Sequence, residues 1–186
     1  MNAQETRKQM RALRRALDAQ EVEMLSQALC ARIRATAAYR QSRSVLLYWP
    51  AGGEISPLAL LEDAQKRFYL PRVEAPGEMS ARLYGGKDAL VKGAYGILAP
   101  GPDAPRLAAA QLELVIVPGL AFTGTMERVG QGGGYYDRFL SRTDAKRMGV
   151  AYDFQIIPRV PQHDCDARMN ILITPTKTLG GNDDGQ

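Results

Sequence analysis

A short apolar run at residues 113–117, ELVIV, is followed a few residues later by the glycine-rich segment RVGQGGGYYDRFL at residues 128–140. A continuous apolar run of this kind is typical of a strand that is buried on both faces of a sheet. Consecutive glycines let the backbone turn tightly and approach a ligand without an intervening side chain. If a helix begins at Tyr135, its free amides face the loop and can bind an anion such as phosphate. The pattern predicts a strand, a ligand-binding loop and a helix in succession.

The rest of the chain continues this alternation of strands and helices. Helices are predicted at residues 4–17, with Met10, Leu13 and Leu17 on the buried face, and from residue 19 onwards, behind a capping box. A further helix is expected from Ser56-Pro57 towards Lys66. Apolar runs predict additional strands at residues 44–49, 67–71, 148–152 and 170–174. We therefore expect an α/β fold, a three-layer, Rossmann-like and largely parallel sheet with helices on both faces.

Length and composition fit one globular domain. A chain of 186 residues can bury one substantial core, which we expect within residues 1–179, with residues 180–186 as a disordered polar tail. No apolar run approaches the roughly 20 residues that cross a bilayer, and the N-terminus lacks the apolar segment of a secretory signal. We expect a cytoplasmic monomer without a membrane partner, in which Cys30 and Cys165 are free thiols.

Charge and histidine content narrow the class of ligand. The net charge is +4, and arginines concentrate in residues 1–43. These arginines form either a solvated helical face or a patch that attracts nucleotide phosphates or nucleic acid. The single histidine, His163, excludes a multi-histidine metal site. A hard cation such as Mg²⁺, held by carboxylates and phosphates, is the compatible metal.

Two widespread phosphate-binding motifs do not describe the glycine-rich segment. The nucleoside triphosphatase loop requires Lys and then Ser or Thr after its last glycine, whereas Tyr135 follows Gly134 here. The dinucleotide fingerprint places spaced glycines directly after the first strand. Asp137 lies in the first turn of the predicted helix, where it suits either a Mg²⁺ ligand or a residue that stabilises the helix dipole. The loop at residues 52–54 also follows a predicted strand, so both loops are expected at one edge of the sheet.

The segments VPGLAF at residues 117–122 and RVGQGGGYYDRFL at residues 128–140 together resemble the signature of the 5-formyltetrahydrofolate cyclo-ligase family. The resemblance covers most of the chain and includes RKQMR at 7–11, GGEISP at 52–57, KRFYLPRV at 66–73 and YGILAP at 95–100. It implies an ATP- and Mg²⁺-dependent enzyme that converts 5-formyltetrahydrofolate into 5,10-methenyltetrahydrofolate, ADP and phosphate. That reaction needs no histidine base, in agreement with the single histidine of this chain.

The resemblance also implies roles for individual residues. The candidates for a direct part in the reaction are Arg128, Tyr135 and Tyr136. Those expected to bind ATP are Arg7, Lys8, Arg11, Gln131, Gly132, Gly133, Gly134, Tyr135, Tyr136 and Asp137. Mg²⁺ would be held by Asp137 and Asp166, with Asp164 as a competing position for the second ligand. Glu54 would bind the pterin through paired hydrogen bonds, beside an apolar wall that includes Tyr48, Trp49 and Tyr95.

Three positions depart from the family pattern. Ala99 stands where glutamate is usual, and Thr123 and Asn170 stand at positions where aspartate is frequent. None of the three is assigned to phosphate binding. Each is expected to influence turnover or substrate preference.

Two other classes of protein share parts of this sequence pattern. The first is a non-catalytic folate- or nucleotide-binding member of the same fold, against which the presence of Glu54, Arg128 and Asp137 argues. The second is a nucleic-acid-binding protein that uses the basic N-terminal helices. No groove-reading motif or aromatic platform accompanies those arginines, so we expect a small-molecule substrate, a reduced formyl-folate, and no nucleic-acid partner.

Overall fold

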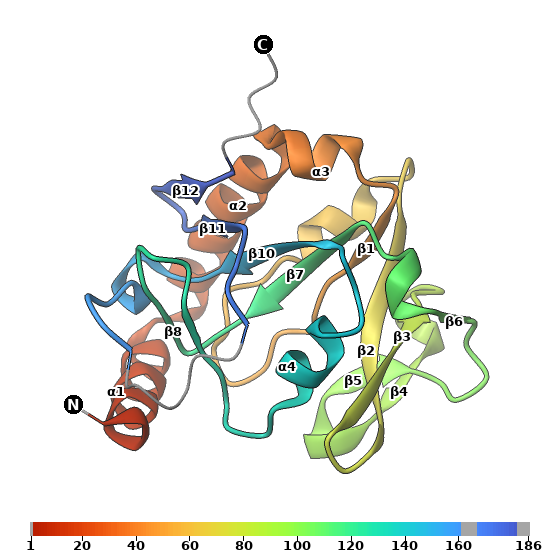
Figure 1. Cartoon of the computed structure of the whole chain (residues 1–186), viewed down its shortest axis with the longest axis horizontal. Coiled ribbons are helices and arrows are strands. Elements are labelled where there is room, and N and C mark those ends of the chain that lie inside the picture. The colour runs from red at the N-terminus through yellow and green to blue at the C-terminus, as the bar shows by residue number, and fades with distance from the viewer. Residues whose placement is uncertain (1, 161–166, 182–186) are drawn as a thin grey trace.

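The computed structural model describes residues 2–160 and 167–181, and a mixed eight-stranded sheet lies at its centre (Figure 1). Its strands are β1 (Ser44–Leu46), β2 (Arg67–Ala75), β3 (Glu78–Leu83), β6 (Arg106–Leu107), β7 (Leu114–Pro118), β10 (Lys146–Val150), β11 (Ile171–Ile173) and β12 (Thr178–Gly180). They are arranged in the order β12-β11-β10-β7-β1-β2-β3-β6. The strands from β11 to β2 run parallel, and β12, β3 and β6 are antiparallel to their neighbours. The expected α/β fold with a largely parallel sheet is confirmed.

Two small hairpins and several helices complete the fold. The hairpins pair β4 (Leu90–Lys92) with β5 (Leu98–Pro100), and β8 (Ala121–Phe122) with β9 (Arg128–Val129). The α-helices are α1 (Ala3–Ala16), α2 (Ala19–Ala35), α3 (Ala37–Gln41) and α4 (Tyr135–Leu140). Short 3₁₀ helices occupy Leu58–Glu62, Lys87–Ala89, Ala94–Gly96, Ala109–Gln111 and Asp153–Gln155. No helix in the described ranges is long and apolar enough to cross a membrane.

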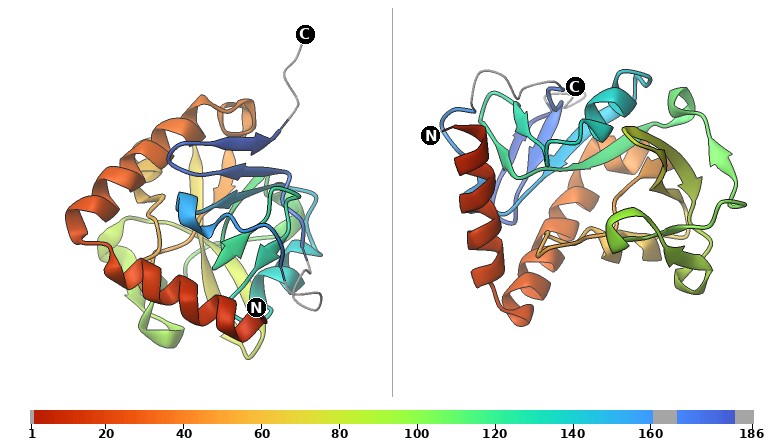
Figure 2. Two further views of the ribbon diagram at one scale, coloured as in Figure 1. Left: turned by 90° about the vertical axis from the view of Figure 1, so that its left-hand side faces the viewer. Right: turned by 90° about the horizontal axis from the view of Figure 1, so that it is seen from below.

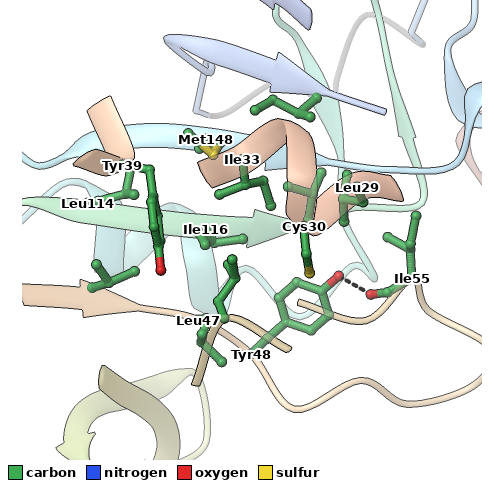
Figure 3. Close-up of a cluster of buried hydrophobic side chains, with 14 of the residues drawn as sticks. Leu29, Cys30, Ile33, Tyr39, Leu47, Tyr48, Ile55, Leu114, Ile116 and Met148 are labelled. Carbon is green, nitrogen blue, oxygen red and sulfur yellow. Dashed lines mark hydrogen bonds between the residues drawn. The ribbon is translucent and has the colours of Figure 1, made fainter. Parts of the chain in front are cut away.

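Both faces of the sheet are buried, as a parallel sheet requires. Leu114 and Ile116 of β7 pack with α2 and α3 on one face, where Cys30 is a buried free thiol (Figure 3). Val115 of β7 reaches the other face and packs in the same cluster as Phe139 of α4. Successive residues of a strand point to opposite faces, so one short apolar run supplies both layers of the core.

Helix α1 diverges from α2 after a sharp turn and lies beside the β8–β9 hairpin (Figure 2). Met10 packs there in a separate cluster with Leu120, Ala121 and Val129. The prediction of which residues form the buried face of this helix was partly wrong. Thr6, Met10 and Arg14 are its buried residues, whereas Leu13 is exposed. The reason is that α1 packs along positions four residues apart, next to a hairpin that is not apparent in the sequence.

Two other local expectations differ from the structure. The helix expected from Ser56-Pro57 is only a short 3₁₀ helix that ends at Glu62, and the Asp63 carboxylate then accepts a hydrogen bond from the Gln65 amide, which favours a turn. The strand expected at residues 67–71 continues to Ala75, so Pro71 lies inside β2. It is accommodated because the pairing of β2 with β1 ends at Tyr69, so β2 has only β3 as its neighbour at this point.

Gly180 is the last residue of β12, and Gly181 follows it in the described part of the chain. The remainder of the expected tail, residues 182–186, lies outside the described residues. So do His163, Asp164, Cys165 and Asp166.

Candidate active site

A cavity of about 560 Å³ lies beyond the carboxyl ends of β1 and β7. Its apolar wall comes from β2, β3 and the β4–β5 hairpin, and its polar wall comes from the glycine-rich segment and α1. The predicted site residues that line it are Arg7, Tyr48, Trp49, Glu54, Tyr95, Arg128, Gln131, Gly132, Gly133, Gly134, Tyr135, Tyr136 and Asp137. Segments from five distant parts of the sequence therefore meet in one place.

The glycine-rich segment turns through conformations that suit glycine. Gly132 has φ +100° and Gly134 has φ +67°, and Gly134 is the residue that immediately precedes α4. Residues other than glycine are strained in this region of backbone conformation. These turns bring the first residues of α4, from Tyr135 to Asp137, to the wall of the cavity.

Helix α1 places basic side chains against the glycine-rich segment. The Arg7 Nε donates to the Gly130 carbonyl at 3.0 Å, and the Arg11 Nη2 donates to the Gln131 Oε1 at 2.8 Å. Lys8, on the same helix, is exposed and does not line the cavity. The structure thus brings two of the three predicted basic residues to the loop, one of them within the cavity wall.

Arg128 and Asp137 form an ion pair at the cavity wall. The distance between the Arg128 Nη2 and the Asp137 Oδ1 is 2.6 Å, and the two side chains are 5% and 20% exposed. The Arg128 guanidinium also lies 5.8 Å from the centre of the Tyr136 ring. Tyr136 has a buried hydroxyl without a hydrogen-bond partner in the described part of the protein. A ligand in the cavity would therefore meet a cation, a carboxylate and an unsatisfied hydroxyl close together.

The acidic residues in the described ranges do not form a ready-made metal cluster. No group of three or more His, Cys, Asp or Glu side chains lies close enough there to hold a metal ion. Mg²⁺ is usually bound by only one or two carboxylates together with water and substrate phosphates. Asp137, which is partly exposed in the cavity wall, fits that pattern. The second predicted ligand, Asp166, lies outside the described residues.

Glu54 is a mostly buried carboxylate in the wall of the same cavity. It accepts a hydrogen bond from the Ala51 amide at 3.1 Å and is also hydrogen-bonded to the Gln131 side chain. Burial raises its pKa, and the nearby Arg14 guanidinium opposes that effect. The Arg14 Nη1 lies 3.5 Å from the Glu54 Oε1. Arg14 was not among the predicted site residues. It lies four residues after Met10 on the buried side of α1, a spacing that indicates a shared helix face but does not by itself show which basic residue is buried.

Tyr95 and Tyr135 meet across the mouth of the cavity. Their hydroxyls lie 3.0 Å apart, and their rings pack edge to face with centres 6.3 Å apart. Tyr95 is 77% exposed and has φ 57°, an uncommon conformation for a tyrosine. It comes from the turn between β4 and β5, so this hairpin is joined to the glycine-rich segment through two aromatic side chains.

The three departures from the family pattern lie in different places. Ala99 is buried in β5 and lines the cavity. Thr123 is also buried, and its hydroxyl bonds with the Thr125 hydroxyl and the Glu127 carboxylate. Asn170 accepts a hydrogen bond from the Arg147 amide at 2.8 Å. Only Ala99 is positioned to touch a ligand in the cavity.

The fold and the cavity define an α/β protein with a cavity beyond the carboxyl ends of its parallel strands, the place where such folds bind ligands. The chain belongs to the 5-formyltetrahydrofolate cyclo-ligase family, because the model of that family matches residues 1–175. This confirms the resemblance inferred from the glycine-rich segment.

Individual relatives agree with this assignment. The 5-formyltetrahydrofolate cyclo-ligase of Escherichia coli K12 is 28% identical over 177 residues, covering 90% of this chain and 97% of the relative. That of Mycolicibacterium smegmatis is 30% identical over 148 residues, covering 74% and 76% of the two chains. The solution structure of 5,10-methenyltetrahydrofolate synthetase from Aquifex aeolicus has a TM-score of 0.88 at 31% identity, covering 100% of this chain and 96% of the other.

Proposed function

We propose that this protein converts 5-formyltetrahydrofolate into 5,10-methenyltetrahydrofolate while ATP is cleaved to ADP and phosphate. The observation that carries the proposal is the meeting of Glu54 with the glycine-rich segment in one cavity of about 560 Å³. A volume of this size is in the range of small-molecule sites. Family membership supports the same reaction.

The reaction consists of two steps. The bond between the γ-phosphorus of ATP and ADP breaks while a bond forms from that phosphorus to the formyl oxygen. The N10 nitrogen of the folate then attacks the formyl carbon, its proton leaves to solvent, and the carbon–oxygen bond breaks to release phosphate. Catalysis of phosphoryl transfer rests mainly on positioning and charge neutralisation. This chain offers Arg7 and Arg128 for the negative charge, with Arg11 beside Gln131.

Asp137 is the described residue proposed to hold Mg²⁺, together with phosphate oxygens, and Asp166 is the proposed second ligand. A bound Mg²⁺ supplies neutralisation of charge on the transferred phosphoryl group. Arg128 keeps the Asp137 carboxylate oriented toward the cavity through their ion pair. Tyr135 and Tyr136 are proposed to contact the reacting groups, since both line the cavity next to the glycine-rich turn.

Glu54 is proposed to recognise the pterin ring. An ionised carboxylate can accept two hydrogen bonds from neighbouring N–H groups of the ring. The exposed ring of Tyr95 and the side chain of Trp49 provide apolar surface on the wall of the same cavity. Sites of this type are lined mostly by apolar and aromatic side chains, with a few polar groups that fix the orientation of the ligand.

The proposal also covers the domain organisation and the state of the protein. We take residues 1–179 as a single domain, since one continuous sheet joins segments from β1 to β12. A cytoplasmic monomer is the proposed state.

The test mixes purified protein with 5-formyltetrahydrofolate and Mg-ATP and follows the absorbance of methenyl-folate. Product should form only with ATP present, and chelation of the metal with EDTA should stop its formation. Intact protein that binds both ligands but forms no product would overturn the proposal in favour of a non-catalytic member. Protein that binds neither ligand would overturn the assignment of the cavity.

A further inference from the structure

Arg14 is a buried cation that contacts two residues of the cavity wall, Glu54 and Gly119. Its side chain is 3% exposed, and its Nη1 lies 3.5 Å from the Glu54 Oε1, whose side chain is 12% exposed. The Arg14 Nη2 donates to the Gly119 carbonyl, at the end of β7. One guanidinium therefore joins two elements of the cavity wall, the loop that carries Glu54 and the turn after β7.

Neighbouring contacts hold this arrangement in place. The Gln155 amide nitrogen donates to the Gly119 and Leu120 carbonyls at 3.0 and 2.8 Å, so Gly119 is fixed from two sides. The Tyr152 hydroxyl donates to the Gly53 carbonyl at 3.1 Å, directly before Glu54 in the chain. A side chain added at Gly53 would approach the Arg14 carbonyl to 3.2 Å. The loop before Glu54 therefore packs closely against α1.

Arg14 is a cation that acts directly on Glu54 and lowers the pKa of this carboxylate. The other titratable groups that face this carboxylate are three tyrosines, Tyr48 after β1, Tyr136 in α4 and Tyr152 after β10. Burial raises the pKa of all three hydroxyls, that of Tyr152 to about 12, so they are uncharged near neutral pH. A buried carboxylate without a paired cation is strongly disfavoured in its charged form.

We propose that Arg14 is the positioning residue for the substrate-binding carboxylate: it holds Glu54 ionised and aligned for the pterin. Gln131 contacts Glu54 from the other side and accepts a hydrogen bond from Arg11. Helix α1 thereby contacts the glycine-rich segment through Arg7 and Arg11. Through Arg14 it also supports Glu54, the carboxylate proposed to bind the pterin. This inference rests on the proposed function, since it names the residue through which Glu54 performs its part.

The test compares Arg14→Met with Arg15→Met, its exposed neighbour on the same helix. Arg14→Met should raise the KM for 5-formyltetrahydrofolate about tenfold or more, leave the KM for ATP within about twofold and shift the acid limb of kcat/KM to higher pH. Arg14→Lys should restore part of the affinity, and Arg15→Met should behave as the wild type. Equal increases in both KM values, or an unchanged folate KM, would overturn the proposal.

A double-mutant cycle separates positioning from general support of the fold. If Arg14 acts through Glu54, Arg14→Met should add little to the folate KM in a Glu54→Gln background. Additive effects would overturn the proposal. A readout independent of turnover is the ¹³C NMR titration of the Glu54 carboxyl, whose midpoint should rise in Arg14→Met. If the wild type forms no product but the Glu54 midpoint is higher in Arg14→Met, the proposed function fails while the pairing of Arg14 with Glu54 stands. An equal midpoint in the two proteins overturns that pairing.

Discussion

The guanidinium of Arg128 and the carboxylate of Asp137 are held 2.6 Å apart by the short segment between β9 and α4. Between them in sequence lie the glycines that line the cavity. The ion pair therefore closes the glycine-rich turn at its base and keeps both charges at the ligand site. Arg128 is only 5% exposed, so removal of the Asp137 carboxylate would leave a buried cation without its ion-pair partner.

Asp137→Asn should reduce kcat by about 100-fold or more, because it removes the charge proposed to hold the metal beside the transferred phosphoryl group. It should also lower the free energy of unfolding by about 1–3 kcal/mol, since Arg128 loses its charged partner. Steady-state kinetics and urea denaturation measure the two effects. Asp144→Asn, on an exposed residue, is the control. Near-normal turnover in folded Asp137→Asn protein would remove Asp137 from the proposed metal site.

Gly134→Ala should weaken ATP binding and destabilise the protein by about 1–2 kcal/mol, because alanine is strained in the left-handed conformation. Gly134 has φ +67°, and an added Cβ would lie 2.7 Å from the Arg138 Nη1. Gly124→Ala is the matched control, since no atom lies within 4 Å of the added Cβ and φ is not positive. Calorimetric titration with ATP measures the effect. Equal affinities in the two variants would contradict the proposed role of the turn.

The protonation of Glu54 should make a measurable contribution to the pH dependence of the free energy of unfolding. Its pKa is raised in the folded protein by burial, so the folded state binds this proton more tightly than the unfolded state. That contribution to stability is complete below the unfolded pKa and is lost as pH rises through the folded pKa. The free energy of unfolding of the wild type should therefore fall relative to that of Glu54→Gln as pH rises above 4.5.

Urea denaturation at a series of pH values measures this difference, with Glu62→Gln, on an exposed glutamate, as the control. A constant difference between wild type and Glu54→Gln from pH 4 to 8 would show that the folded pKa of Glu54 is not raised. In the enzyme assay, folate KM should rise as pH falls through the same range, because the proposed hydrogen bonds need the ionised carboxylate.

Tyr95→Ala should raise the folate KM about fivefold to 20-fold while changing the free energy of unfolding by less than about 0.5 kcal/mol. The ring is 77% exposed and supports little of the core, yet it forms part of the cavity wall. Tyr95→Phe removes only the hydroxyl contact with Tyr135 and should have a smaller effect. A Tyr95→Ala variant with wild-type folate kinetics would exclude this side chain from the substrate site.

Local sequence patterns predicted much of the fold and of the cavity wall. The run at residues 113–117 and its neighbours have the apolar character of buried strands, and parallel strands bring their following loops to one edge. This is why Glu54 and the glycine-rich segment could be expected together. The β4–β5 hairpin and its contact with Tyr135 were not predicted, because such short strands carry little periodic signal.

Arg14 illustrates that the sequence alone does not distinguish a buried arginine from the exposed basic residues beside it. It stands among Arg7, Lys8, Arg11 and Arg15, all of them basic residues on one helix. Which of them is buried depends on how α1 docks against the β8–β9 hairpin, and that docking is a tertiary contact between distant segments. For the same reason Leu13, an apolar residue at helical spacing, is exposed.

The most direct test of the account follows the formyl oxygen itself. Protein, Mg-ATP and 5-formyltetrahydrofolate labelled with ¹⁸O in the formyl group are allowed to react, and the released phosphate is analysed by mass spectrometry. Transfer of the phosphoryl group to the formyl oxygen predicts one ¹⁸O atom in each phosphate, formed in step with methenyl-folate. Methenyl-folate that appears together with unlabelled phosphate would contradict the account.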